Sequence, residues 1–171
     1  MITLFPGPGR LSDAASPDLR GRSYRLYAEV ESGEGVLISH GDRTGGYALR
    51  IDDGHLVHDY VHAGVHSVVR SEVPVPSGPA RVGVHVNRTG TSATVVLVIN
   101  GAPVGGGEIP SLARARTGYT GVDIGCDRGV TVGGYPPPAR FTGLLRRIEI
   151  EVDDDQCLDG AAVLEIEGAT G

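Results

Sequence analysis

Residues 35–71 read GVLISHGDRTGGYALRIDDGHLVHDYVHAGVHSVVRS, and this stretch decides the fold class of the chain. Its Asp53-Gly54 pair fits a two-residue type I′ hairpin turn, in which glycine adopts the positive φ that other residues resist. Because side chains alternate faces along a strand, the turn also sets the register of the two strands. The predicted inward-facing pairs are Ile51 with Leu56, Leu49 with His58 and Tyr47 with Tyr60. The stretch therefore predicts antiparallel β-structure.

Titratable side chains on the face that should pack in the core are the unusual feature of this hairpin. His58, Tyr60 and His62 share that face with the apolar residues of the preceding strand. Arg50 and Asp59 lie on the opposite face, close enough for a diagonal ion pair. We therefore expect polar groups to line an otherwise apolar sheet surface.

Apolar alternation predicts further strands along most of the chain. The predicted strands cover residues 24–31, 36–40, 47–52, 55–61, 67–72, 81–86, 93–99, 104–109 and 141–152. Residues 93–99 are apolar on both faces, which predicts an internal strand, and Asn100-Gly101 is a second type I′ turn. Strands this frequent, separated by turns, predict an all-β fold with two antiparallel sheets packed as a sandwich.

The last predicted strand and the two chain ends complete the organisation. Alternation places Leu144, Ile148, Ile150 and Val152 inward, but it also turns Arg146 inward, which the pattern does not explain. We expect residues 1–22 to form an irregular N-terminal segment packed on the sandwich, and residues 23–152 to form the β-sandwich domain. Residues 153–171 are expected to form an acidic C-terminal extension with a short strand, and residues 111–140 read as irregular.

Composition excludes several classes of function. The chain of 171 residues has a net charge of −6, and its scattered basic residues, all arginines, argue against nucleic-acid binding. No apolar run reaches the length of a membrane span, and the N-terminus lacks the features of a signal peptide, so we expect a cytoplasmic protein. Cys126 and Cys157 form no metal-binding pattern, so we expect free thiols, with one disulfide as the alternative if the protein is exported.

Three segments of the chain resemble the C-terminal domain of bacterial, especially actinobacterial, arylsulfatases. They read FPGPGRLSDAASPDLRGRSYRLYAEVE (5–31), GVLISHGDRTGGYALRIDDGHLVHDY (35–60) and RFTGLLRRIEIEV (140–152). The resemblance implies a concanavalin A-like, laminin-G-like jelly roll, which in that family packs against the sulfatase catalytic domain. The chain lacks the CxPxR or SxPxR motif that becomes formylglycine in the catalytic domain, so sulfatase activity is not implied. Its own Met1 suggests a free-standing protein or an excised fragment.

The chain departs from the family pattern just after the Asp-Gly hairpin. There it reads HDYVHAGVH, which keeps Tyr60 and adds His58, His62 and His66. An imidazole titrates near neutrality, and a guanidinium can bind an anion with two hydrogen bonds. The expected ligand-binding residues are His40, Arg43, Tyr47, His58, Tyr60, His62, His66 and Arg70.

A metal site is not expected on this strand. His58 and His62 are four residues apart, hence about 13 Å, whereas Zn–N bonds are only ~2.1 Å. Asp123 and Asp127 lie among glycines, and an oxygen-rich loop of this kind can hold Ca²⁺. Asp and Gly are also the usual turn residues, so we expect no cofactor, with Ca²⁺ as the alternative.

Three functions remain open from the sequence. The first is a free-standing sandwich that binds a small molecule on a concave face through Tyr47, His58, Tyr60 and His62. The second is a small cofactor-free enzyme, a cyclase or isomerase of specialised metabolism, with His58 and Tyr60 as the catalytic proton-transfer pair. The third is a module that docks a partner protein or a second copy of the chain, or a lectin-like sugar binder. Aromatic residues make up only 5% of the chain, which weighs against the lectin.

Overall fold

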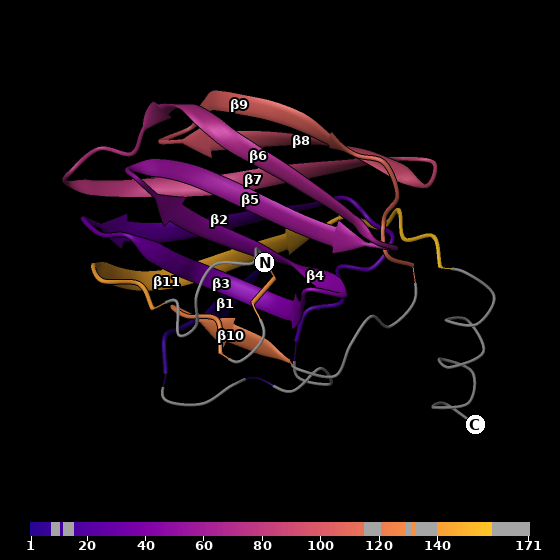
Figure 1. The fold of residues 1–171 in the computed structure, drawn as a ribbon, viewed down its shortest axis with the longest axis horizontal. Coiled ribbons are helices and arrows are strands. Elements are labelled where there is room, and N and C mark those ends of the chain that lie inside the picture. The colour runs from indigo at the N-terminus through magenta and orange to yellow at the C-terminus, as the bar shows by residue number, and fades with distance from the viewer. Residues whose placement is uncertain (8–10, 12–15, 115–120, 129–130, 133–139, 159–171) are drawn as a thin grey trace.

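The computed structural model describes residues 1–7, 11, 16–114, 121–128, 131–132 and 140–158. Within these ranges it contains no helix, and its strands form two antiparallel sheets that pack face to face (Figure 1). The strands are β1 (Ile2–Leu4), β2 (Tyr24–Glu31), β3 (Gly35–Asp42), β4 (Gly45–Asp52), β5 (His55–His62), β6 (Val65–Pro74), β7 (Pro79–Thr89), β8 (Ser92–Ile99), β9 (Ala102–Ile109), β10 (Val122–Ile124) and β11 (Leu144–Val152). The predicted all-β, two-sheet sandwich is confirmed.

The order of the strands defines the two sheets. The six-stranded sheet has the order β1-β11-β2-β7-β8-β9, and the five-stranded sheet has the order β10-β3-β4-β5-β6. Strand β2 shows the alternation read from the sequence, with every second residue buried. Strand β8 lies between β7 and β9, so the prediction of an internal strand at 93–99 is confirmed.

The hairpin that decided the fold class has the predicted register. Asp53 and Gly54 both have positive φ, at 49° and 76°, as a type I′ turn requires. The three predicted pairs across β4 and β5 are all present. The Nε atom of Arg50 lies 2.7 Å from Oδ2 of Asp59, so the predicted diagonal ion pair is also confirmed.

Two short edge strands were not predicted. Ile2–Leu4 form β1, which pairs with β11, so residues 1–22 are not wholly irregular. Val122–Ile124 form β10, which pairs with β3 inside the segment that read as loop. A run of three residues is too short to establish a period of two, which is why the sequence pattern missed both. The short strand expected in the C-terminal extension lies outside the described residues.

A β-bulge explains the anomaly in the last strand. The register of β11 against β2 shifts between Leu145 and Arg147. The extra residue resets the alternation, so Leu145 is buried while Leu144 and Arg146 are exposed. Arg146 therefore does not point inward, and its Nη2 lies 3.4 Å from Oε2 of Glu31. The predicted inward position of Leu144 was wrong for the same reason.

Strand β5 is buried on both faces, although only its inner face packs against the second sheet. Its burial pattern is continuous except at the two ends. On the outer face, Val61 packs with Ala48 of β4 and with Val132, which follows β10 in the chain. The segment after β10 therefore covers part of the outer face of the five-stranded sheet.

The sandwich has two different edges. At one edge, which we call the closed edge, β6 and β9 meet directly: a Cβ atom added to Gly107 would lie 2.6 Å from Cγ2 of Val69. At the other edge, which we call the open edge, β10 of one sheet lies beside β1 and β11 of the other (Figure 1). Loops rather than strands bridge the sheets at the open edge.

Candidate functional site

The inner-face group predicted to bind a ligand lies inside the core. Tyr47, His58 and Tyr60 are 5%, 1% and 7% exposed, and they pack between the two sheets. The ring of Tyr47 lies 6.5 Å from that of Tyr24 on β2, in the opposite sheet. The expectation of an open binding face lined by these three residues therefore does not describe this structure. Strand alternation gives the side of the sheet, but not whether a second sheet covers that side.

His58 is poorly placed for proton transfer to a substrate. Neither of its ring nitrogens has a hydrogen-bond partner among the described residues. Burial lowers the pKa of His58 to about 4, so the imidazole is neutral at pH 7. The Oη atom of Tyr60 accepts a hydrogen bond from the backbone N–H of Ala113 at 2.9 Å, and burial raises the pKa of this phenol. Both side chains are therefore buried in the core, away from solvent.

Three other expected ligand residues, His40, Arg43 and His62, lie toward one end of the five-stranded sheet. His40 is half-buried, and its ring meets the edge of the Tyr47 ring with centroids 5.7 Å apart. His62 is half-buried at the end of β5. Arg43 is exposed in the turn between β3 and β4. The register of β3, β4 and β5 thus places all three residues toward the same end of the sheet.

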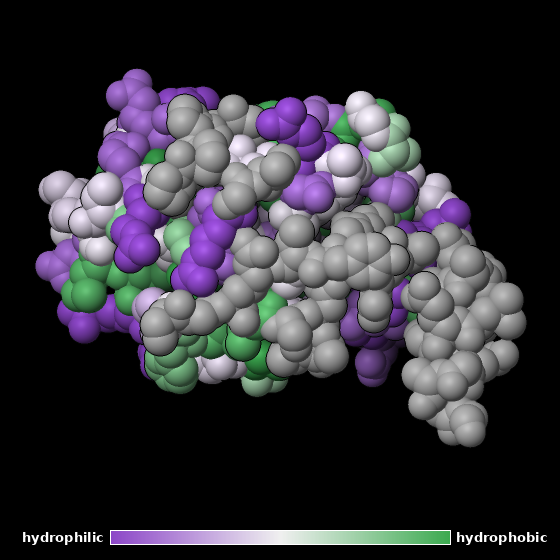
Figure 2. Space-filling view, turned by 60° about the horizontal axis from the view of Figure 1, so that its bottom comes forward, coloured by the Kyte–Doolittle hydropathy of each residue, from purple (hydrophilic) through white to green (hydrophobic). Residues whose placement is uncertain are grey.

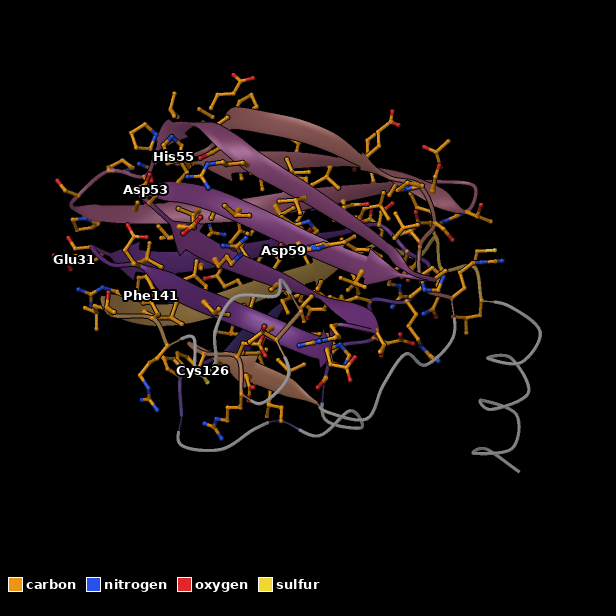
Figure 3. The ribbon with its side chains drawn as sticks, in the orientation of Figure 1. Glu31, Asp53, His55, Asp59, Cys126 and Phe141 are labelled. Carbon is orange, nitrogen blue, oxygen red and sulfur yellow. The ribbon has the colours of Figure 1, made fainter. Side chains whose placement is uncertain are left out.

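His66 and Arg70 project from the outer face of the five-stranded sheet, on β6. Nε2 of His66 lies 2.9 Å from Oδ1 of Asp59, whose other oxygen takes the Arg50 ion pair. Figure 3 labels Asp59 near the middle of the sheet. Arg70 pairs with Asp52 at 3.1 Å. These contacts satisfy charges on the sheet surface, and they lie on the face opposite to His58 and Tyr60.

A pocket lies at the open edge, away from the histidines. It has a volume of about 590 Å³. Its lining comes from the ends of β1, β10 and the start of β11: Pro6, Gly7, Ile124, Gly125, Cys126, Arg128, Arg140, Phe141, Gly143, Leu144 and Leu145. Figure 3 shows Cys126 and Phe141 near one another at this edge.

Backbone hydrogen bonds hold the pocket walls in place. The N–H of Gly125 donates to the carbonyl of Leu37 at 2.7 Å, which ties the β10 wall to β3. The N–H of Phe141 donates to the carbonyl of Gly125 at 2.9 Å, which joins the two walls to each other. The hydroxyl of Ser39 donates to the carbonyl of Cys126 at 3.0 Å. The pocket is therefore built on bonded segments next to rigid strands.

The charged groups of the pocket are both arginines. Among the described lining residues, Arg128 and Arg140 are cationic and none is acidic. Asp123 contacts Arg128 in two ways. Oδ2 of Asp123 accepts a hydrogen bond from the backbone N–H of Arg128 at 2.8 Å, and Oδ1 of Asp123 lies 3.8 Å from Nε of Arg128. Phe141 and Leu145 supply a buried apolar floor.

The two carboxylates considered for Ca²⁺ bond to their own loop. Asp123 accepts from the N–H of Arg128, and Asp127 accepts from the N–H of Val132 at 3.1 Å. Within the described part of the chain, no three His, Cys, Asp or Glu side chains cluster in a way that could hold a metal ion. The Ca²⁺ alternative stays a prediction. Cys126 and Cys157 are both free, and no disulfide joins them.

Sequence reasoning missed the pocket because its residues come from segments without a period. The available signal was the broken alternation before Arg147, since a bulge often lies at the rim of a site. Nothing in the sequence distinguished Arg128 and Arg140 from the other arginines, which are scattered along the chain.

Comparison of the sequence matches neither a family model nor a curated protein. The fold does have solved neighbours. The sialidase module CBM40 of Ruminococcus gnavus, bound to α2,3-sialyllactose, has a TM-score of 0.59 at 15% identity, covering 89% of this chain and 84% of that chain. The LG4-5 domains of the mouse laminin α1 chain have a TM-score of 0.62 at 16% identity, covering 92% of this chain and 43% of that chain.

These likenesses show that the fold is the concanavalin A-like, laminin-G-like jelly roll. This confirms the fold that the sequence resemblance implied. Among the described residues, no helix has the length and apolar character needed to cross a bilayer.

Proposed function

We propose that the chain is a non-catalytic binding module that holds a small molecule in the open-edge pocket. The pocket itself carries this proposal: its volume of about 590 Å³ falls within the range of small-molecule sites. It also has their usual composition, an apolar floor with a few polar groups that can orient a ligand.

The structural neighbours support a binding role. The Ruminococcus gnavus CBM40 was solved with α2,3-sialyllactose bound, so a protein of similar fold holds a sugar. The alternative of an acid–base enzyme requires His58 and Tyr60 to reach a substrate, and both are buried in the core. The kinship with arylsulfatase C-terminal domains stays a prediction from the sequence.

The test compares two bulky substitutions at opposite edges. Leu144→Trp fills the mouth of the pocket, whereas Val68→Trp places the same side chain at an exposed position of β6. Small molecules and mono- and disaccharides are screened by ligand-observed NMR against the unmodified protein and both variants. Compounds that bind the pocket should lose binding to Leu144→Trp and keep it with Val68→Trp. Binding that survives Leu144→Trp would place the ligand elsewhere and overturn the proposal.

A second candidate function is docking of a protein or a second copy through the open edge. Large apolar side chains are exposed there at Met1, Ile2, Phe5 and Leu144. Figure 2 turns this side toward the viewer and shows hydrophobic patches beside strongly hydrophilic residues. Sedimentation of the chain and of Phe5→Ser separates the cases, since only a homodimer would dissociate in the variant.

A further inference from the structure

We propose that the open-edge pocket selects a ligand with a carboxylate, sulfate or phosphate group on a compact apolar body, and that Arg140 determines this selectivity. The inference rests on the proposed function, because it names the ligand class of the same pocket. It follows from the balance of charge in the lining, from the partners of the two arginines and from the rigidity of their backbone.

The charge of the pocket is opposite to that of the whole chain. The chain carries a net charge of −6, yet the described lining residues hold two guanidinium groups and no carboxylate. A partly enclosed site strengthens electrostatic attraction, because less water screens the charges. An anion in this pocket would therefore be favoured over a neutral molecule of the same shape.

The two arginines contribute differently. Asp123, which is almost completely buried, lies 3.8 Å from Nε of Arg128 and offsets part of its charge. Arg140 is exposed, and among the described residues no carboxylate lies within salt-bridge distance of it. Arg140 therefore supplies the uncompensated positive charge of the pocket.

This state of Arg140 differs from that of the arginines on the strands of the six-stranded sheet, which have carboxylate partners. Arg25 pairs with Glu151 and Asp153, and Arg81 pairs with Glu29 and Glu149. On those strands, a guanidinium fork that could bind two oxygens already has a carboxylate partner. The planar fork of Arg140 can offer the same two hydrogen bonds to an anion from outside the chain.

The backbone that carries Arg140 is held in position. A Cβ atom added to Gly35 would lie 2.4 Å from the carbonyl oxygen of Arg140, so the two backbones are in direct contact. Gly35 also has a φ of 112°, which favours glycine. The following residue, Phe141, donates its N–H to Gly125. A fixed backbone lowers the entropy lost when the side chain binds an anion.

The apolar floor of the pocket indicates the chemistry of the uncharged part of the ligand. Ile124, Phe141 and Leu145 are each less than a tenth exposed and line the site beside the arginines. Apolar atoms of a ligand can cover this floor while the anionic group meets Arg140. We therefore expect a small ring or chain that carries one anionic group.

The test uses two probes of matched shape, phenylacetate and the neutral phenylacetamide, titrated into isotope-labelled protein and followed by NMR at residues 124–128 and 140–145. Phenylacetate should bind at least about tenfold more tightly, since a hydrogen bond to a charged group is worth roughly that factor or more. Arg140→Ala should remove the preference, and Arg140→Lys should keep only part of it, because an ammonium lacks the planar fork. Arg146→Ala is the matched control, because this nearby exposed arginine pairs with Glu31.

The outcomes separate this inference from the proposed function. Equal binding of the two probes at the pocket would overturn the anion selectivity and leave the binding module intact. A preference for phenylacetate that survives Arg140→Ala, or disappears in Arg146→Ala, would overturn the role of Arg140. If neither probe binds while neutral compounds from the screen occupy the pocket, the anion class is wrong. A pocket that binds nothing in either experiment would overturn both proposals.

Discussion

The closed and open edges of the sandwich are both built from antiparallel strands, but the two sheets meet differently at them. They are in direct contact at the closed edge and are separated by a pocket at the open edge. At the closed edge, Gly105 and Gly107 of β9 remove two side chains, and β6 approaches so closely that a Cβ at Gly105 would lie 2.9 Å from the carbonyl oxygen of Arg70. At the open edge, β1 and β10 are each three residues long, and loops complete the wall around a pocket. Close packing fills the first edge, whereas the second contains the pocket.

The two edges also differ in whether their charged groups have partners within the chain. Polar groups near the closed edge are satisfied within the chain, as when Asp59 bonds to both Arg50 and His66. At the open edge Arg140 has no such carboxylate partner among the described residues. We therefore expect substitutions in β4–β6 and β9 to change folding, and substitutions in the pocket to change binding.

Removal of the buried carboxylate in β5 should have the largest effect. Asp59→Ala removes the fully buried carboxylate that lies 2.7 Å from Arg50, while the exposed Asp52 lies 3.7 Å away, and it should lower the free energy of unfolding by about 3–5 kcal/mol. Urea denaturation measures the change. Glu31→Ala is the control, because its pair with Arg146 is exposed and such a pair contributes about 0–1 kcal/mol. Equal effects of the two variants would contradict the importance of burial.

The next effect is a loss of stability in acid through His58. Burial lowers the pKa of His58 from 6.5 to about 4, so between these values the unfolded chain binds more protons than the folded chain. Stability should fall as the pH decreases through this window, with a total contribution of about 3 kcal/mol. His58→Leu, which suits the neighbouring Leu49 and Val69, should remove this contribution.

The measurement for His58 is the free energy of unfolding from pH 7 to pH 4 in both proteins. The difference between them should grow as the pH falls, and the variant should also be more stable at pH 7, where it no longer buries two unpartnered nitrogens. His55→Leu, at a half-buried position of the same strand, controls for the change of residue type. A constant difference across the pH range would show that His58 is not buried as described.

A smaller effect is expected where the two sheets touch at the closed edge. Gly107→Ala puts a Cβ against Val69 and should lower the free energy of unfolding by about 1–3 kcal/mol. Combining it with Val69→Ala should cost less than the sum of the two single changes, because the contacting methyl group is gone. Gly106→Ala, whose added Cβ has ordinary contacts, should leave stability almost unchanged. Strict additivity would mean that the sheets are not in contact here.

The smallest change in folding should come from the open edge. Arg140→Ala should alter the free energy of unfolding by less than about 0.5 kcal/mol, as for most exposed positions. Thermal and urea denaturation of the same variant used for binding provide the measurement. A large destabilisation would show that Arg140 supports the fold, and the contrast between the two edges would then fail.

Much of the fold could be predicted from local patterns in the sequence, but the open-edge pocket could not. The Asp53-Gly54 turn gave the register of β4 and β5, which placed Arg50 beside Asp59 correctly. The same register placed His58 on the inner face, but it contained no information on the sheet that covers that face. Ala63 and Gly64 form another turn in which both residues have positive φ. An alanine at such a position does not indicate a turn in the sequence, because alanine rarely adopts positive φ.

The amino-acid sequence by itself determined the strands, their pairing across tight turns and the faces of their side chains, because these depend on neighbours in the chain and on a period of two. Only the tertiary structure decided which faces are covered and where space remains. Residues such as Gly35 and Arg140, far apart in the chain, meet at the open edge after both sheets have formed. Contacts of this kind depend on packing between distant segments, and no local pattern records them.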